Sequence, residues 1–247
     1  MWDDPRQLNA TAAGLLVLAV AALLWSALSW LVRQPAFAFR EAAIRAPLMR
    51  ANPAHIEAVI RDELQGTFFT MDLDRGREAL ARVPWVRKVA LRRQWPRTLE
   101  VTIEEHVPLA RWNDVALVNT QGGLFTADYN GELPQFSGPD ARAVDVAGRY
   151  REWTEVLSPL GLALHELHLS PRGGWHLRAV GDAGPLAIEL GRDEPAARLA
   201  RFVAAYGRTV AALARGGTRI DHVDLRYHNG FAARVPGFKE RLPKRAA

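Results

Sequence analysis

The longest apolar run of the chain lies near its N-terminus. Residues 7–32 contain no charge, and the most apolar part spans residues 10–32. A helix of this length rises about 34 Å, more than the roughly 30 Å hydrocarbon core of a bilayer. Trp25 and Trp30 lie toward its C-terminal end, where indole rings favour the headgroup region. The pattern predicts a transmembrane helix over residues 10–32, preceded by a short tail of residues 1–9.

A cleavable signal peptide is the competing interpretation of this run. Ala36-Phe37-Ala38 has the small-x-small form of a cleavage site. The apolar core of a signal peptide is about 7–15 residues long, which is shorter than this run. A core helix of a soluble domain is also disfavoured, because the run is apolar on every face. A retained membrane anchor is therefore the favoured interpretation.

Charges beside the run leave its orientation open. The positive-inside rule places the more basic flank in the cytoplasm, but it weakens for a large translocated domain. The flanking charges are Arg6, Asp3 and Asp4 before the run, and Arg33, Arg40, Arg45 and Arg50 after it.

A small α/β module is predicted over residues 36–107. Asn52-Pro53 supplies an N-cap and a first-turn proline to a helix with 3.6-type apolar spacing. Asp72 can cap a second helix. Strict alternation then predicts two strands on either side of Trp95-Pro96, and a weaker signal places an earlier strand around residues 39–44. The predicted order is β-α-α-β-β.

Short strands separated by turn signals continue over residues 108–237, including a hairpin around Gly173-Gly174. A short helix is predicted near residues 152–157, and Asp193 is the predicted N-cap of the longest soluble helix. We expect a mainly antiparallel β-domain with a C-terminal helix and terminal strands. Residues 238–247 are expected to form a basic tail. The whole chain is therefore assigned to the α+β class.

The terminal strands predict a sheet edge. Val223, Leu225 and Tyr227 alternate on one side, Asn229-Gly230 is a tight-turn dipeptide, and Phe231 begins another strand. An edge strand offers backbone donors and acceptors to a partner strand. Core closure by Tyr227 and Phe231 is the alternative.

Composition excludes several kinds of chemistry. The chain has 247 residues, a net charge of +5 and no cysteine, which excludes disulfides, thiolate metal sites and a cysteine nucleophile. Its arginines are spread along the chain, so no basic face for nucleic acid is predicted. Five basic residues near the Trp95 turn point alternately to two faces, which favours a solvated sheet edge over a site for phosphate headgroups or nucleic acid. They are Arg87, Lys88, Arg92, Arg93 and Arg97.

No catalytic constellation is found in the sequence. His165 and His168 would point to opposite faces of a strand, which makes a poor metal site. His222 and Asp224 would share a face, but no nucleophile elbow, P-loop or dinucleotide motif accompanies them. We therefore predict no catalytic, cofactor-binding or metal-binding residue, and no enzymatic activity.

Several separate motifs, taken in order, resemble the FtsQ/DivIB family of bacterial cell-division proteins, and look most like its proteobacterial FtsQ branch. They are Val83-Pro84-Trp85-Val86-Arg87-Lys88-Val89, Arg93-Gln94-Trp95-Pro96-Arg97-Thr98-Leu99, Glu104-Glu105-His106-Val107-Pro108, Arg111-Trp112, Arg172-Gly173-Gly174-Trp175 and Val223-Asp224-Leu225-Arg226-Tyr227-His228-Asn229-Gly230-Phe231-Ala232. Each motif alone is weak, and their order makes the resemblance specific. Core packing is the simpler expectation for Trp85, Trp95 and Trp112 individually.

The resemblance implies a POTRA domain over residues 36–107 that mainly recruits the protein to the septum. It implies a single-pass protein of the bacterial inner membrane, with a cytoplasmic N-terminus and a periplasmic C-terminal domain. The implied partners are FtsB and FtsL, other divisome proteins, and the lipid bilayer around residues 10–32.

In the family, the last strands dock FtsB. The resemblance therefore implies that Arg226, Tyr227, Gly230 and Phe231 bind the partner. The implied function is a non-enzymatic scaffold that holds FtsB–FtsL and helps to control septal cell-wall assembly.

Two alternative functions fit parts of the pattern. POTRA modules also occur in protein translocation and outer-membrane assembly, but the chain lacks a regular series of lipid-facing strands of about ten residues. A periplasmic wall hydrolase lacks its catalytic groups, and activity lost on substitution of His222 or Asp224 would revive it.

Overall fold

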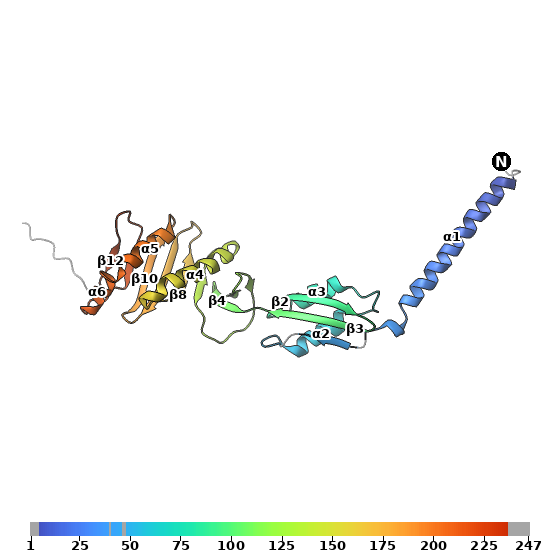
Figure 1. Ribbon diagram of the computed structural model, residues 1–247, viewed down its shortest axis with the longest axis horizontal. Helices are drawn as coiled ribbons and strands as arrows, with labels where there is room; N and C mark the ends of the chain where they lie inside the picture. The colour runs from blue at the N-terminus through green and yellow to red at the C-terminus, as the bar shows by residue number, and fades with distance from the viewer. Residues whose placement is uncertain (1–4, 40, 46–47, 237–247) are drawn as a thin grey trace, which may run out of the picture. The chain divides into compact units, whose positions relative to one another are not determined.

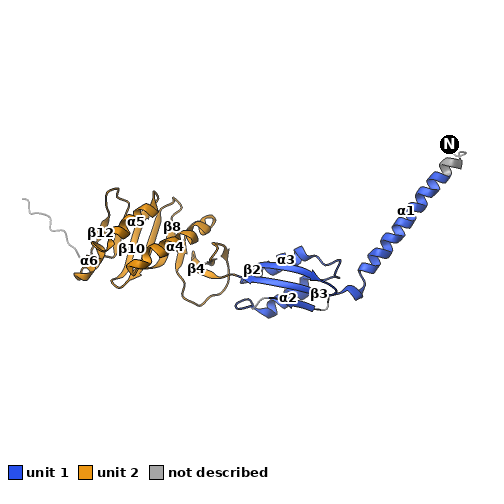
Figure 2. Ribbon diagram, viewed as in Figure 1, with its two compact units in different colours: residues 1–105 blue, residues 106–247 orange. Residues whose placement is uncertain are grey.

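The computed structural model describes residues 5–39, 41–45 and 48–236 (Figure 1). The chain divides into two compact units, Met1–Glu105 and His106–Ala247 (Figure 2). The first unit contains an apolar helix and a three-stranded sheet with its helices, and the second contains a nine-stranded sheet. The expected basic tail, residues 238–247, lies outside the described residues.

The N-terminal helix α1 (Pro5–Val32) contains the apolar run. Its segment Asn9–Val32 is long and apolar enough to cross a membrane, and is the one such segment among the described helices. None of its most apolar window is buried within the protein. An apolar helix that no protein surface covers suits a lipid environment.

The first sheet confirms the predicted β-α-α-β-β order. Its strands are β1 (Glu41–Ile44), β2 (Val86–Gln94) and β3 (Thr98–Glu105), arranged β1-β3-β2. β1 is parallel to β3, whereas β2 is antiparallel to it. The helices α2 (Pro53–Glu63) and α3 (Leu73–Ala81) pack on each other, and α3 packs on β2.

Both helix caps predicted for the first unit are present. The side-chain oxygen of Asn52 accepts the Ala54 N–H at 3.0 Å. The Asp72 carboxylate accepts the N–H groups of Asp74 and Arg75 at 3.0 and 3.1 Å. Each bond satisfies a backbone donor that the first helical turn leaves without a partner.

The expectation of core packing holds for two of the three tryptophans and fails for the third. Trp85 and Trp112 are buried, but Trp95 is 65% exposed. Trp95 lies in the turn between β2 and β3, beyond the last residue pair of the hairpin, Gln94 with Thr98. A side chain there has no sheet face beneath it, so core packing is the wrong interpretation for Trp95.

The second sheet has the strand order β12-β11-β10-β9-β8-β7-β4-β5-β6. It is mainly antiparallel, as expected, but it is mixed, because β4–β7, β7–β8 and β10–β11 are parallel pairs. The predicted hairpin around Gly173-Gly174 joins β8 to β9. The strands are β4 (Pro108–Trp112), β5 (Ala116–Asn119), β6 (Leu124–Phe125), β7 (Gln135–Ser137), β8 (Ala163–Leu169), β9 (Trp175–Gly181), β10 (Gly184–Gly191), β11 (His222–Asp224) and β12 (Ala232–Arg234).

Helices supply the connections for two of the three parallel pairs. α4 (Ala143–Leu157) connects β7 to β8, and α5 (Pro195–Tyr206) with α6 (Val210–Arg215) connects β10 to β11. Figure 1 shows α4 and α5 lying over the sheet. Trp153 of α4 and Phe202 of α5 belong to the same buried cluster as alternate strand residues. The short 3-10 helices are η1 (Pro35–Phe37), η2 (Asp140–Arg142) and η3 (Ser158–Leu160).

Two helix predictions are wrong. The helix expected near residues 152–157 begins at Ala143, so α4 and not α5 is the longest helix of the second unit. Asp193 does not cap α5, because Glu194 occupies the N-cap position and makes no side-chain capping bond. The start of α4 has no side-chain cap either, so the sequence carries no local signal for it.

The cap at Asp72 gives a stability prediction. Asp72→Ala should lower the free energy of unfolding of the first unit by about 1 kcal/mol, because two N–H groups lose their acceptor. Asp62→Ala is the matched control, since this acid lies near the C-terminal end of α2, where a negative charge is unfavourable. Denaturant unfolding of the full chain in detergent checks both. Equal loss in the two variants would contradict the capping role.

Candidate partner-binding site at the C-terminal sheet edge

β12 forms one edge of the nine-stranded sheet. It pairs antiparallel with β11, with Val223 opposite Ala233. Its three residues are all exposed, and no strand lies on its other side among the described residues. An edge strand of this kind presents backbone donors and acceptors that another strand can use.

The predicted alternation fails at Tyr227. Val223 and Leu225 are buried, but Tyr227 is 58% exposed, so the expectation that the three residues share a side is wrong. The Leu225 N–H still donates to the Glu189 carbonyl of β10 at 2.8 Å. The chain leaves the sheet directly afterwards.

Asp224 supplies the physical reason for this departure. Its Oδ1 accepts the backbone N–H of Arg226 at 3.0 Å, a bond from a side chain to the backbone two residues on. Aspartate bonds of this type bend the chain into a turn. The turn carries Tyr227 away from the sheet, which excludes the alternative that Tyr227 closes the core.

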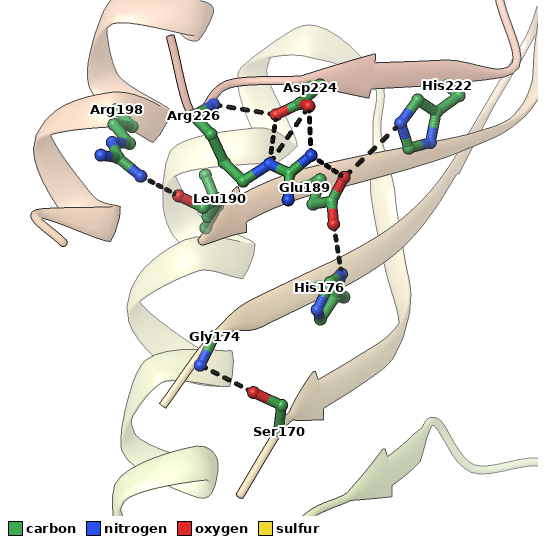
Figure 3. Close-up of polar contacts among 9 residues, drawn as sticks. All are labelled: Ser170, Gly174, His176, Glu189, Leu190, Arg198, His222, Asp224 and Arg226. Atoms are coloured by element: carbon green, nitrogen blue, oxygen red, sulfur yellow. Dashed lines mark hydrogen bonds and ion pairs between the residues drawn. The ribbon is translucent and has the colours of Figure 1, made fainter. Parts of the chain in front are cut away.

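The same aspartate also holds the Arg226 side chain (Figure 3). Arg226 Nε donates to Asp224 Oδ1 at 2.9 Å, and Nη2 donates to Oδ2 at 2.7 Å. Nη2 also lies 3.4 Å from Glu189 Oε2. The Arg226 side chain nevertheless stays 55% exposed, against 12% for that of Asp224. Arg226 therefore has an inner edge bound to carboxylates and an outer edge open to a partner.

The electrostatics of this pair follow from its geometry. The hydrogen bond from Arg226 lowers the pKa of Asp224, partial burial opposes the shift, and His222 adds a smaller favourable charge. Asp224 in turn raises the pKa of Arg226. The pair stays charged at neutral pH.

A row of polar side chains continues from Arg226 across the wet face of the sheet. His176 Nδ1 and His222 Nε2 lie 3.5 and 3.8 Å from the Glu189 carboxylate. His222 and Asp224 share a face, as predicted. The strand registers align Ser137, His168, His176, Glu189 and Asp224.

Glu189 is the residue of this site that the sequence did not indicate. Its partners are His176 of β9, His222 of β11 and Arg226 just after β11, so the register of the strands brings them together. Among the described residues, no three or more His, Asp or Glu side chains are grouped so that they could hold a metal ion. Burial and the neighbouring His176 lower the pKa of His168, which keeps that ring neutral at pH 7.

The remaining two predicted residues complete the turn. Phe231 is half-buried and packs edge-on against Phe202 of α5, with ring centroids 5.7 Å apart. Gly230 has open space around it. Residues 227–232 line a hollow beside β12. The structure therefore brings Arg226, Tyr227, Gly230 and Phe231 to one sheet edge, where Tyr227 is the exposed aromatic group.

Both units match known family models. Residues 37–106 match the POTRA domain, FtsQ-type, and residues 110–226 match the C-terminal domain of cell division protein FtsQ/DivIB. Together with the apolar helix, these matches define a cell-division protein with an FtsQ-type POTRA domain. The second match ends at Arg226, so Tyr227, Gly230 and Phe231 lie beyond it.

Relatives that align with nearly the whole chain indicate the same family. Cell division protein FtsQ of Burkholderia pseudomallei is 38% identical over 246 residues, which cover 97% of this chain and 96% of the relative. The Bordetella pertussis protein of that name is 39% identical, with 94% and 92% covered, and that of Nitrosospira multiformis is 36% identical, with 95% and 99% covered. The chain belongs to the FtsQ/DivIB family, as the motifs predicted. Members of this family are generally non-enzymatic structural proteins of the divisome.

The Arg226–Asp224 pair gives a prediction about pH. Arg226→Ala should raise the pKa of Asp224, because the largest cause that lowers it is removed. Arg234→Ala is the matched control: Arg234 pairs with Asp221 and should raise the pKa of that residue alone. Carboxyl-carbon NMR of the full chain in detergent measures both groups.

The sign of the stability effect also follows. The pKa of Asp224 is lower in the folded state than the unfolded value of about 3.9, so the pair stabilises the fold above that pH. This stabilisation is lost as the pH falls through the folded-state pKa. The stability difference between the wild type and Arg226→Ala should therefore shrink in acid, and a difference independent of pH would contradict the ion pair.

Proposed function

We propose that this protein is a non-enzymatic divisome scaffold that binds FtsB–FtsL and other division proteins and helps to control septal cell-wall assembly. The single observation that supports it most directly is the open edge of β12 beside the exposed Tyr227. Membership of a family of structural divisome proteins makes division proteins the partners to expect there.

Strand addition is the proposed mode of binding. A partner segment in extended conformation would pair with β12 and prolong the sheet. Each backbone hydrogen bond gained contributes only about 0.5–1.5 kcal/mol net, and β12 has three residues. Backbone pairing alone therefore gives weak binding, and side chains must supply the rest.

Tyr227 and Arg226 are the proposed sources of that additional binding. Exposed aromatic groups at the centre of an interface are common binding hot spots, as are arginines. Tyr227 can cover apolar surface of the partner, and the outer edge of Arg226 can receive a carboxylate. Phe231 would contribute indirectly, because its packing on Phe202 holds the turn that carries Tyr227 in place.

The proposed topology assigns each part of the chain a place. Residues 1–9 would be a cytoplasmic tail, and residues 10–32 would cross the inner membrane. The POTRA domain of residues 36–107 and the β-domain of residues 108–237 would lie in the periplasm at the division septum. The candidate membrane helix supports a single pass.

Tyr227→Ala tests the docking edge. It should weaken binding of the cognate FtsB–FtsL complex about tenfold or more, because truncation of a hot-spot aromatic typically costs about 2 kcal/mol or more. Val115→Ala is the matched control: Val115 is 78% exposed but lies in the turn between β4 and β5, toward the opposite end of the sheet. Titration of the full chain in nanodiscs gives both affinities. Unchanged affinity in Tyr227→Ala would reject the assigned role.

A second experiment tests the anchor. Mass spectrometry of the protein isolated from membranes should find residues 1–32 still attached, because the apolar helix is longer than the core of a signal peptide. A mature N-terminus near Phe39 would show cleavage instead and would overturn the single-pass topology.

A further inference from the structure

Five aromatic rings gather at one end of the first unit. They come from three segments: the link after α1, the loop between α2 and α3, and the turn between β2 and β3. We call this group the aromatic end, and it consists of Phe37, Phe39, Phe68, Phe69 and Trp95. Its successive ring centroids lie 5.3 to 5.9 Å apart. Phe69 is 50% exposed and Trp95 is 65% exposed, so these rings form a surface and not a core.

The aromatic end is tied to the end of the candidate membrane helix. Phe37 follows Val32 so closely that even an extended link would span at most about 18 Å. The Thr67 hydroxyl donates to the Val32 carbonyl at 2.7 Å, and the Phe68 N–H donates to the Phe37 carbonyl at 2.8 Å. The headgroup layer beyond the hydrocarbon core is about 5–8 Å thick on each side. The Thr67–Val32 bond holds the loop between α2 and α3 at the end of α1, so Phe68 and Phe69 lie beside the point where α1 would leave the hydrocarbon core.

Unpaired positive charge surrounds the exposed tryptophan. Arg92 and Arg97 flank Trp95 in sequence, and neither forms an ion pair within the described part of the chain. Glu100, the register partner of Arg92, pairs instead with Arg45 at 3.3 Å. Tryptophan beside free arginine suits the membrane interface, where the ring lies among headgroups and the cation meets lipid phosphate.

We propose that the aromatic end docks into the lipid headgroup layer next to α1, with Trp95 and Phe69 inserted and Arg92 and Arg97 on lipid phosphates. The tether and the Thr67–Val32 bond favour lipid over a protein occupant, because they hold these rings at the membrane in any case. For Arg92 and Arg97, this proposal departs from the expectation of a solvated sheet edge. Docking would make the bilayer a second support for the POTRA domain, besides the covalent link to α1.

The opposite end of the same domain provides an internal control. Met49 is 82% exposed, and its N–H donates to the Glu105 carboxylate at 3.1 Å. Glu105 ends β3, whereas Thr98 beside the Trp95 turn begins it, so the strand separates the two sites by about 23 Å. A docked aromatic end leaves Met49 in water.

The absence of cysteine makes the test direct. Gln94→Cys and Met49→Cys each place a single nitroxide label, and Gln94→Cys leaves all five rings intact. The full chain is reconstituted into vesicles of phosphatidylethanolamine and phosphatidylglycerol. The label at position 94 should be more accessible to oxygen than to a water-soluble nickel complex, and the label at position 49 should show the reverse.

The charge contribution has its own measurement. In the position-94 labelled chain, Arg92→Gln and Arg97→Gln should each lower the ratio of docked to undocked spectra about fivefold. In vesicles of phosphatidylcholine alone this effect should disappear, because the anionic lipid is absent. An equal loss in both kinds of vesicle would overturn the role of lipid phosphate.

Two outcomes would overturn the docking itself. Equal exposure to the nickel complex at positions 94 and 49 in vesicles would place the aromatic end in water. Protection of position 94 in cell membranes but not in vesicles of purified protein would identify a protein as the occupant. Trp95→Ser should reduce docking. Thermal unfolding of this variant and of the parent chain then shows whether a loss of docking reflects a loss of folding.

Discussion

The parallel pairing of β10 with β11 determines the arrangement of the C-terminal region. A parallel neighbour requires a long crossover, and α5 with α6 provides it. The crossover covers one face of the sheet and buries Leu199 and Phe202 in the same cluster as the strands. Since β9 already pairs with the other side of β10, β11 and the following strand β12 extend the sheet outward. The candidate docking edge is thus a consequence of chain direction.

The turn before β12 depends on the Asp224 carboxylate, which binds both a backbone N–H and a side chain. Asp224 bends the backbone through the Arg226 N–H and holds the Arg226 guanidinium at the same time. Because Asp224 is mostly buried and paired with β10 through its register with Glu189, the bend is fixed to the sheet. Phe231 then returns to pack on Phe202. Tyr227 is consequently exposed by the path of the backbone.

Sequence patterns predicted the elements that local chemistry defines and missed those that tertiary contacts define. The caps at Asn52 and Asp72 and the alternation in β3 depend on neighbours in sequence, and all three were read correctly. The start of α4 carries no capping bond, and burial of its apolar face must stabilise it instead. At the site, the four candidate residues could be named from their motif, whereas Glu189 and the exposure of Tyr227 follow from strand register and from the Asp224 bend.

The surroundings of three arginines are a further feature that the sequence alone does not predict. In sequence, Arg92, Arg97 and Arg226 are similar cations, each within three residues of an aromatic residue. Within the described structure, Arg226 has two carboxylates and the other two have none. An arginine whose inner edge is already bound loses less conformational entropy on binding and is held in one position, which suits recognition of a defined partner group. An arginine without a carboxylate keeps its freedom and its full charge, which suits a fluid and negatively charged lipid surface. The distribution of carboxylates therefore distinguishes the proposed protein-binding site from the proposed lipid-binding site.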